Sequence, residues 1–221
     1  MKKLNLILTL LLLSLLTGTM AFAQALTVRL GADYVELTDD RDEDFKYEGH
    51  QLTGKVWFAD LPQLSITGSC TNLDAKTGDT TEYNEIDYAV TGEYRIHNET
   101  NYGFTLTAGW LSEGRAVGDE ERTTDYSYLT LGGKGNYVLT DGLQTIADVS
   151  YASNAPFKDE HDADMSILRA KVGAELQPTP ELKFSAFYLY NKYTVKIDEL
   201  NLYDDFITSG FNVGASYAFS F

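Results

Sequence analysis

The chain has 221 residues, of which 33 are acidic and 17 basic, and its formal net charge is −16. This excess of carboxylates excludes a nucleic-acid partner, because contacts to phosphate need Lys and Arg in excess. The single cysteine, Cys70, excludes an intrachain disulfide, and the length corresponds to one domain.

The first segment in chain order has the features of a secretory signal peptide. Met-Lys-Lys opens the chain, a Leu-rich run follows, and residues 21–23 (Ala-Phe-Ala) offer small residues at a cleavage site. The apolar run is shorter than the roughly 20 residues of a membrane-spanning helix. We therefore expect residues 1–23 to be the signal, with cleavage after Ala25 as the alternative. Residues 24–221 then form the mature domain, with a net charge of −18 once the two lysines of the signal are removed.

After the signal, apolar and polar residues alternate with a period of two, which predicts β-strands with one apolar face. Each segment is close to the about 9 to 11 residues that a tilted membrane strand requires. An even number of strands suits an up-and-down barrel. We count ten segments, with eight as the alternative: 26–37, 48–58, 63–73, 84–96, 102–112, 125–139, 142–152, 164–177, 181–195 and 206–221.

The connections between these segments are expected to alternate between long and short. The long ones are 38–47, 74–83, 113–124, 153–163 and 196–205. Short turns on one side and longer loops on the other are typical of outer-membrane barrels, with both termini on the short-turn, periplasmic side. The sequence therefore predicts an all-β fold, a single transmembrane antiparallel up-and-down β-barrel with short periplasmic turns and longer extracellular loops.

Charged residues fall on only one face of the ten predicted strands. The other face carries apolar, aromatic and small side chains. Arg or Lys on a lipid-facing strand at mid-bilayer costs about 2 to 4 kcal/mol, so we expect lipid around the uncharged face and the charges in the lumen. A soluble barrel with its charges outside is the alternative that the alternation alone leaves open. The twelve predicted lumen charges are Arg29, Asp33, Lys55, Asp87, Glu93, Arg95, Lys134, Asp148, Arg169, Lys171, Glu175 and Lys183.

A barrel of ten strands has a narrow interior, little wider than the roughly eight-stranded barrels that side chains fill. Seven of the predicted lumen charges are basic and five acidic. Because unpaired charges are costly in a confined interior, we expect a paired network rather than an open bore. Phe187 and Leu189 also point inward in the ninth segment, either as an apolar plug or because a bulge shifts the register.

Most of the excess acidity lies in the predicted long connections, as in 39–44, 118–121, 159–162 and 204–205. Solvated loop charges are the default interpretation, and a mouth that gathers cations is the functional one. No segment has the ligand spacing of an EF-hand, so we expect no metal site and no cofactor.

The three histidines, His50, His97 and His161, give little support for an enzyme. Residues 159–162 (Asp-Glu-His-Asp) resemble the acidic and histidine residues of the omptins, which are ten-stranded outer-membrane proteases. The second acidic pair of that family has no match here, and its strands and loops are longer. We therefore expect no catalytic residues and no enzymatic activity.

The last strand alternates without a break to Phe221. Asn212, Gly214, Tyr217, Phe219 and Phe221 match the C-terminal insertion signal that the barrel assembly machinery of Gram-negative bacteria reads. With the signal peptide and the repeated hairpins, the chain resembles the small monomeric outer-membrane barrels, the porin-like group that includes OmpX-type proteins. The resemblance implies the cell outer membrane as location, outer-membrane lipid and the assembly machinery as partners, and a monomer.

The sequence thus predicts an integral outer-membrane β-barrel that serves as a wall protein or as a narrow porin-like passage for ions or small solutes, with a preference for cations. The alternative is a surface-recognition or adhesion protein that uses acidic extracellular loops, with or without divalent cations. No pattern in the chain identifies a solute or a binding partner.

Overall fold

The computed structural model describes residues 26–78, 80–116, 124–154, 163–197 and 202–221, so the predicted signal peptide lies outside the described residues. Within these ranges no helix is long and apolar enough to cross a membrane. The described residues form ten strands: β1 (Leu26–Asp39), β2 (Asp42–Phe58), β3 (Leu61–Thr77), β4 (Thr80–Asn98), β5 (Tyr102–Ala116), β6 (Thr124–Thr140), β7 (Leu143–Asn154), β8 (Ala163–Leu176), β9 (Leu182–Ile197) and β10 (Leu202–Ser220).

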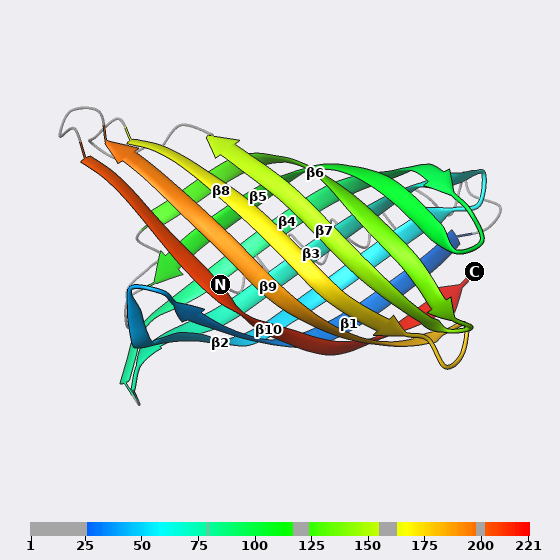
Figure 1. The fold of residues 1–221 in the computed structure, drawn as a ribbon, viewed down its shortest axis with the longest axis horizontal. Coiled ribbons are helices and arrows are strands. Elements are labelled where there is room, and N and C mark those ends of the chain that lie inside the picture. Colours follow the sequence, from blue (N-terminus) through cyan, green and yellow to red (C-terminus); the bar gives the residue numbers. More distant parts are fainter. Residues whose placement is uncertain (1–25, 79, 117–123, 155–162, 198–201) are drawn as a thin grey trace.

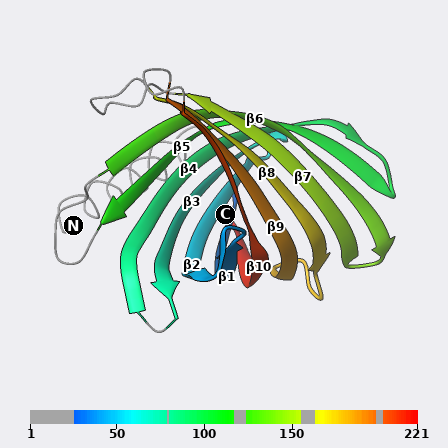
Figure 2. The same cartoon turned by 60° about the vertical axis from the view of Figure 1, so that its left-hand side comes forward.

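The ten strands close into one antiparallel barrel in which each strand pairs with its neighbours in the chain (Figure 1). The last strand returns to the first, and the β1–β10 ladder runs from Thr27 opposite Ser220 to Asp39 opposite Thr208. Figure 2 shows the strands tilted around the barrel axis. Closure removes exposed strand edges, so every strand has a hydrogen-bonded partner on both sides. The predicted ten-stranded, up-and-down barrel is confirmed.

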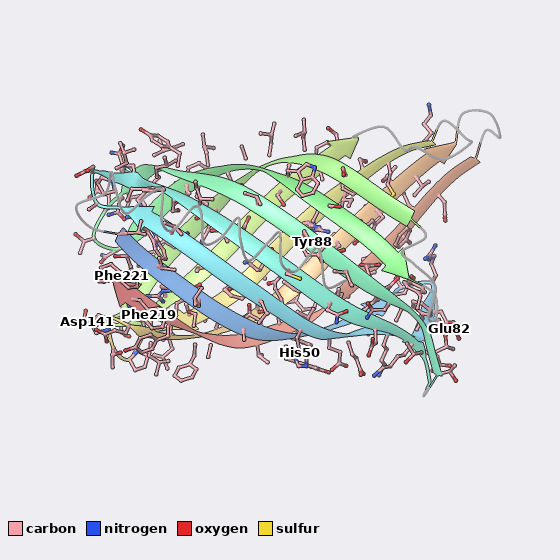
Figure 3. All side chains as sticks on the ribbon, turned by 180° about the vertical axis from the view of Figure 1, so that it is seen from behind. His50, Glu82, Tyr88, Asp141, Phe219 and Phe221 are labelled. Carbon is pink, nitrogen blue, oxygen red and sulfur yellow. The ribbon has the colours of Figure 1, made fainter. Side chains whose placement is uncertain are left out.

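The two ends of the barrel differ, and we name them by what they hold. The terminal end holds Leu26 and Phe221, which are hydrogen-bonded to each other, together with the turn at Asp141 and Gly142 (Figure 3). The loop end holds the turn at residues 40–41 and the tip of the β3–β4 hairpin. At the terminal end Gly142 has a φ of 82°. An Asp-Gly pair in a two-residue hairpin loop supplies this positive φ at no steric cost, which explains the tight β6–β7 turn.

Three of the predicted long connections are wrong, and one of them is 196–205, because the acidic Asp204 and Asp205 belong to β10 rather than to a loop. β1 and β2 are joined by residues 40 and 41 alone, and only residues 78 and 79 separate β3 from β4. The segments 38–47 and 74–83 are therefore mostly strand. Charged residues in their strand portions, such as Asp74 and Lys76, lie on the outer face of the wall, where the Lys76 ammonium binds the Glu48 carboxylate at 2.9 Å. Acidic residues occur in loops and also on strands whose outer face meets water, and in these segments they lie on strands.

The alternation continues in these strand extensions, but the two faces exchange their chemistry. Along most of β1 the charged Arg29 and Asp33 share the inner face while Leu30 is exposed outside. Nearer the loop end of the same strand, Val35 and Leu37 are buried inside, and the charged Glu36 lies on the outer face. The wall is thus polar inside and apolar outside over most of its height, then apolar inside and charged outside at the loop end. A wall in hydrocarbon requires the first pattern and a wall in water the second.

Large apolar side chains cover the outer face of the wall where its inner face is polar (Figure 3). Leu131, Leu129 and Phe211 are 68%, 65% and 64% exposed. Patches of this kind are far larger than soluble monomers tolerate in water, whereas lipid chains solvate them without cost. The outer face therefore forms the lipid-facing surface of a membrane barrel.

A single arginine should report where hydrocarbon lies. Leu106 is midway between the rings of Tyr102 and Trp110 on the outer face of β5, so Leu106→Arg should destabilise the barrel in lipid vesicles by about 2 to 4 kcal/mol. Leu139→Arg is the matched control, since Leu139 is equally exposed but borders the β6–β7 turn, where the cost is about 0 to 1 kcal/mol. Denaturant titration followed by Trp fluorescence gives both values. Equal costs at the two positions would contradict a lipid-facing band.

Candidate functional site

Most of the predicted lumen charges lie on the inner face of the wall. They are closer to the terminal end than the loop-end part of the barrel, where the inner face is apolar. Lys55 Nζ on β2 lies 2.5 Å from Glu93 Oε2 on β4, although β3 separates these strands. The Thr67 hydroxyl on β3 donates to the other Glu93 oxygen at 2.7 Å. Side chains from three strands in a row meet in this way only on the concave inner surface, so this group lies in the lumen.

A second group of charges lies on β7, β8 and β9. Lys183 Nζ donates to Glu175 Oε1 at 2.6 Å, and Gln144 Nε2 donates to Glu175 Oε2 at 2.8 Å. The Lys171 ammonium lies 4.7 Å from the centre of the Phe187 ring. Glu175 is buried, and its two oxygens both have donors. Such saturation by neighbouring side chains fixes the charges in place.

A third group crosses the barrel. Arg169 on β8 forms an ion pair with Glu113 on β5, although two strands, β6 and β7, lie between them in the wall. Glu113 is buried, and it was missing from the predicted charges because it was assigned to a loop. It continues the inward positions of β5 after Leu111, and that continuation was the available signal.

The other predicted charges are placed as follows. Arg29 donates to the carbonyl of Pro180 at 3.3 Å, and Asp33 accepts from the Ser185 hydroxyl at 3.5 Å. Lys134 and Asp148 are cross-strand partners in the β6–β7 ladder. Asp87 is half-buried on β4, on the same inner face as Glu93, whereas Arg95 is exposed at the terminal end, beside a break in the β4–β5 register.

The residues of the predicted insertion signal divide between the two faces of β10. Tyr217, Phe219 and Phe221 are exposed on the outer face, and Asn212 is buried inside. A Cβ atom at Gly214 would lie 1.6 Å from Asp33 Oδ1, so only glycine lets the Asp33 carboxylate fit against β10. This glycine therefore also has a packing role in the finished barrel.

Apolar side chains fill the lumen toward the loop end, and we call them together the apolar layer. Tyr193 stacks on Phe206 with ring centres 4.6 Å apart and planes 6° apart. The layer consists of two clusters, Leu111, Tyr128, Ala152, Met165, Ile167, Tyr193 and Phe206 in one, and Val35, Leu37, Tyr47, Leu73 and Ala75 in the other, with Phe45, Tyr83 and Leu189 packed against the second.

The space where the two clusters meet is small. A cavity of about 10 Å³ lies there, with Glu85 and Thr208 as its polar lining. A cavity of this size holds about one water molecule. Phe187 and Leu189, the two apolar residues predicted to point inward, are respectively buried and packed against the layer. Only Leu189 belongs to the layer, whereas Phe187 lies among the lumen charges beside Lys171.

Above the apolar layer, at the loop end, lies a cleft of about 390 Å³. We call it the loop-end cleft, and its lining consists of Asp39, Arg41, Asp42, Phe45, Tyr47, Tyr83 and Phe206. Arg41 is held by Asp39 through two hydrogen bonds, of 2.8 and 3.0 Å, and its guanidinium lies 4.1 Å from the centre of the Phe206 ring. The opposite wall is aromatic, with the Tyr47 and Tyr83 hydroxyls 3.0 Å apart.

The described histidines lie away from these groups. His50 is exposed on the outer face beside Tyr34, with ring centres 5.8 Å apart, and His97 stacks on Tyr102 near a turn at the terminal end. The acidic runs 118–121 and 159–162, with His161, lie outside the described residues. Over the part of the chain that the structure covers, no three His, Cys, Asp or Glu side chains are grouped to hold a metal ion.

Comparison with known proteins gives one similar sequence and several similar folds. Outer membrane protein P5 of Haemophilus influenzae is 30% identical in an alignment 160 residues long, which covers 62% of this chain and 45% of P5. The chain thus spans less than half the length of that relative. No protein-family model matches the sequence. The lipid-facing wall, the charged interior and this sequence relative agree on location. The chain is an outer-membrane β-barrel protein.

Among solved structures the outer-membrane barrel is similar in fold to the Escherichia coli outer membrane protease OmpT, with a TM-score of 0.46 and 12% identity over 90% of this chain and 98% of the protease. For Neisserial surface protein A the TM-score is 0.42 and the sequence identity 12%, over 87% of this chain and 97% of that protein. For an outer-membrane channel from Pseudomonas putida F1 the TM-score is 0.48 and the sequence identity 8%, over 90% of this chain and 96% of the channel.

The ion pair that crosses the lumen should matter more than one on the rim. Glu113→Gln leaves Arg169 in the barrel interior without its counter-charge, and the loss of one partner of a buried pair typically costs about 3 to 5 kcal/mol. Glu48→Gln is the control, because it removes the same charge from the outer-face pair with Lys76, where solvent screens the loss and stability should be unchanged. Denaturant titration in micelles measures both variants, and a stable Glu113→Gln barrel would refute the interior pairing.

Proposed function

We propose that this protein is a closed outer-membrane barrel that acts through its loop end as a surface-recognition protein. The observation that supports this proposal best is the apolar layer, which packs Tyr193, Phe206 and Ile167 across the interior. With both termini on the periplasmic side, as is usual for such barrels, the loop end faces the outside of the cell.

The apolar layer is a barrier to ions for a simple reason. An ion that enters it must leave its water shell, and transfer of a charge into an apolar medium costs several kcal/mol even after relaxation. The aromatic stack and the fully buried Ile167 offer the ion no ligand, and the polar groups at this level, Glu85 and Thr208, border a cavity that has room for only about one water molecule. Below the layer the charges are engaged in short pairs such as Lys55–Glu93. A resting barrel of this kind is closed to hydrated ions.

The loop end has the properties of a recognition surface. The β1–β2 and β3–β4 hairpins extend past the lipid-facing band, so they present charged outer faces and the aromatic loop-end cleft to the medium. Binding sites are concave and mostly apolar with a few polar groups, and this cleft is within the usual size range of about 300 to 1,000 Å³. A rigid barrel wall keeps these groups in fixed positions.

A narrow passage with cation preference is the second candidate. It is favoured by the charged lumen on the terminal side of the layer, where Lys171, Lys183 and Glu175 face the interior. Conduction in this case requires the apolar layer to move aside. A catalytic role is not part of our proposal, because His50 and His97, the histidines among the described residues, contact Tyr34 and Tyr102 and not the lumen charges. We also propose a monomer in the membrane, since the closed barrel has no free edge.

Planar-bilayer recording tests the closed state. The wild-type barrel should give no discrete conductance steps, whereas the double variant Tyr193→Ala with Phe206→Ala should leak, because it removes the stacked rings from the apolar layer. Tyr188→Ala is the matched control. Tyr188 lies on the same strand but is exposed on the outer face, so that variant should stay silent.

Steady cation-selective steps from the wild-type barrel would contradict the proposed function and favour the narrow passage. A double variant that stays silent while it keeps its heat-shifted migration in a gel would show that the apolar layer is not what closes the lumen.

A further inference from the structure

The loop-end cleft contains a cation of its own. The Arg41 guanidinium lies over the Phe206 ring at 4.1 Å, and Asp39 binds it with two hydrogen bonds. Asp204 adds a weaker ion pair at 3.4 Å. A cation over an aromatic face, flanked by a carboxylate, is a favourable arrangement that strengthens as water is excluded. One half of the cleft is therefore occupied by the planar guanidinium of Arg41, which Phe206 and Asp39 hold in place.

The other half of the cleft also combines aromatic rings with a carboxylate. Phe45, Tyr47 and Tyr83 form an aromatic group, with Phe45 and Tyr47 edge to face at 5.3 Å. Phe45 and Tyr83 are only partly buried, so their faces line the open volume. Asp42 lines the same cleft with an exposed carboxylate. Aromatic faces beside a carboxylate bind ammonium groups that carry apolar substituents.

The charge balance of the cleft selects for cations. Among the described residues that line the cleft, Asp39 and Asp42 outnumber the one cation, Arg41, and Asp204 beside the cleft pairs with Arg41 as well, so the carboxylates are in excess. The mature chain as a whole is strongly acidic, which raises the local concentration of cations and repels anions. An inorganic cation would have to lose tightly bound water before it could reach the aromatic wall. A neutral apolar molecule would gain nothing from Asp42.

We propose that the loop-end cleft binds a small organic cation, an ammonium group with an apolar body, between Asp42 and the Phe45–Tyr83 wall. The proposal rests on the proposed function in one respect, because it assumes that the loop end is the working face of the barrel. Arg41 stays on Phe206 and neutralises Asp39, which leaves Asp42 to pair with the ligand.

Choline and its neutral isostere 3,3-dimethylbutan-1-ol separate charge recognition from shape. Both are titrated calorimetrically into the folded barrel in detergent micelles, with NaCl matching the ionic strength of the choline solution. We expect saturable choline binding, and binding of the isostere about tenfold weaker or absent, because a desolvated cation–π contact is worth about that factor.

Three variants locate the site. Asp42→Asn and Phe45→Leu should each weaken choline binding, by about tenfold and about fivefold, since one removes the counter-charge and the other the ring. Glu82→Gln removes an equally exposed carboxylate from the loop end of β4, outside the cleft, and should leave the affinity unchanged (Figure 3). Heat-shifted migration in a gel establishes that each variant is folded.

The outcomes are distinguishable from those of the conductance test. A folded barrel that is silent in bilayers but gives no saturable choline binding overturns the site and leaves the closed barrel standing. Equal binding of the isostere overturns it too, as does an unchanged affinity in Asp42→Asn. Choline binding that follows the expected variant pattern supports the site even if the wild-type barrel were to conduct, in which case only the proposed closed state fails.

Discussion

The structure depends on one constraint, the cost of placing an ionised side chain in hydrocarbon. A β-strand sends successive side chains to opposite faces, so a strand that crosses lipid must place its charges at every second position or at none. Leu30, Leu52 and Leu131 illustrate the lipid side of this rule, and Lys55, Glu93 and Lys183 the interior side. Once charges are confined to the interior of a narrow barrel, they have to pair, and the short bridges between non-adjacent strands follow from that confinement.

The same constraint explains the exchange of faces near the loop end. On β3, Leu73 and Ala75 are buried inside while Asp74 and Lys76 face outward, the reverse of the pattern closer to the terminal end. Where water replaces lipid outside, charges move to the outer face and apolar side chains can pack in the interior. The apolar layer and the loop-end cleft are consequences of strands that continue beyond the hydrocarbon. A membrane-type wall and a soluble-type wall are thus joined along the same ten strands.

Much of the fold could be predicted from the sequence. Lipid on one side of each strand and a polar lumen on the other require apolar and polar side chains to alternate with a period of two. The number of strands and the choice of lipid-facing side follow from this alternation. The lengths of the first two hairpins could not be obtained in the same way, since acidic residues such as Asp42 and Asp74 are compatible with a loop and with a water-facing strand. The aromatic Phe45, Tyr47 and Tyr83 held the missing signal, because they alternate with those charges on what becomes the inner face.

The candidate site was less accessible from the sequence than the fold. Pairs such as Arg169–Glu113 depend on which strands face each other across the barrel, and that arrangement requires the closed topology. The cleft likewise joins residues of β1 and β2 to Tyr83 of β4 and Phe206 of β10, which are far apart in the chain. Periodicity identifies the face on which a residue lies. It does not identify the neighbours that the residue meets there.

Spin labels on two outward positions of β1 test the central claim most directly. Nitroxides are attached at Leu30→Cys and Glu36→Cys in a Cys70→Ala background, in barrels reconstituted into lipid bilayers. The account predicts that the label at position 30 collides with dissolved oxygen and not with a water-soluble nickel chelate, and that the label at position 36 does the reverse. Free access of the chelate to the label at position 30 would contradict it.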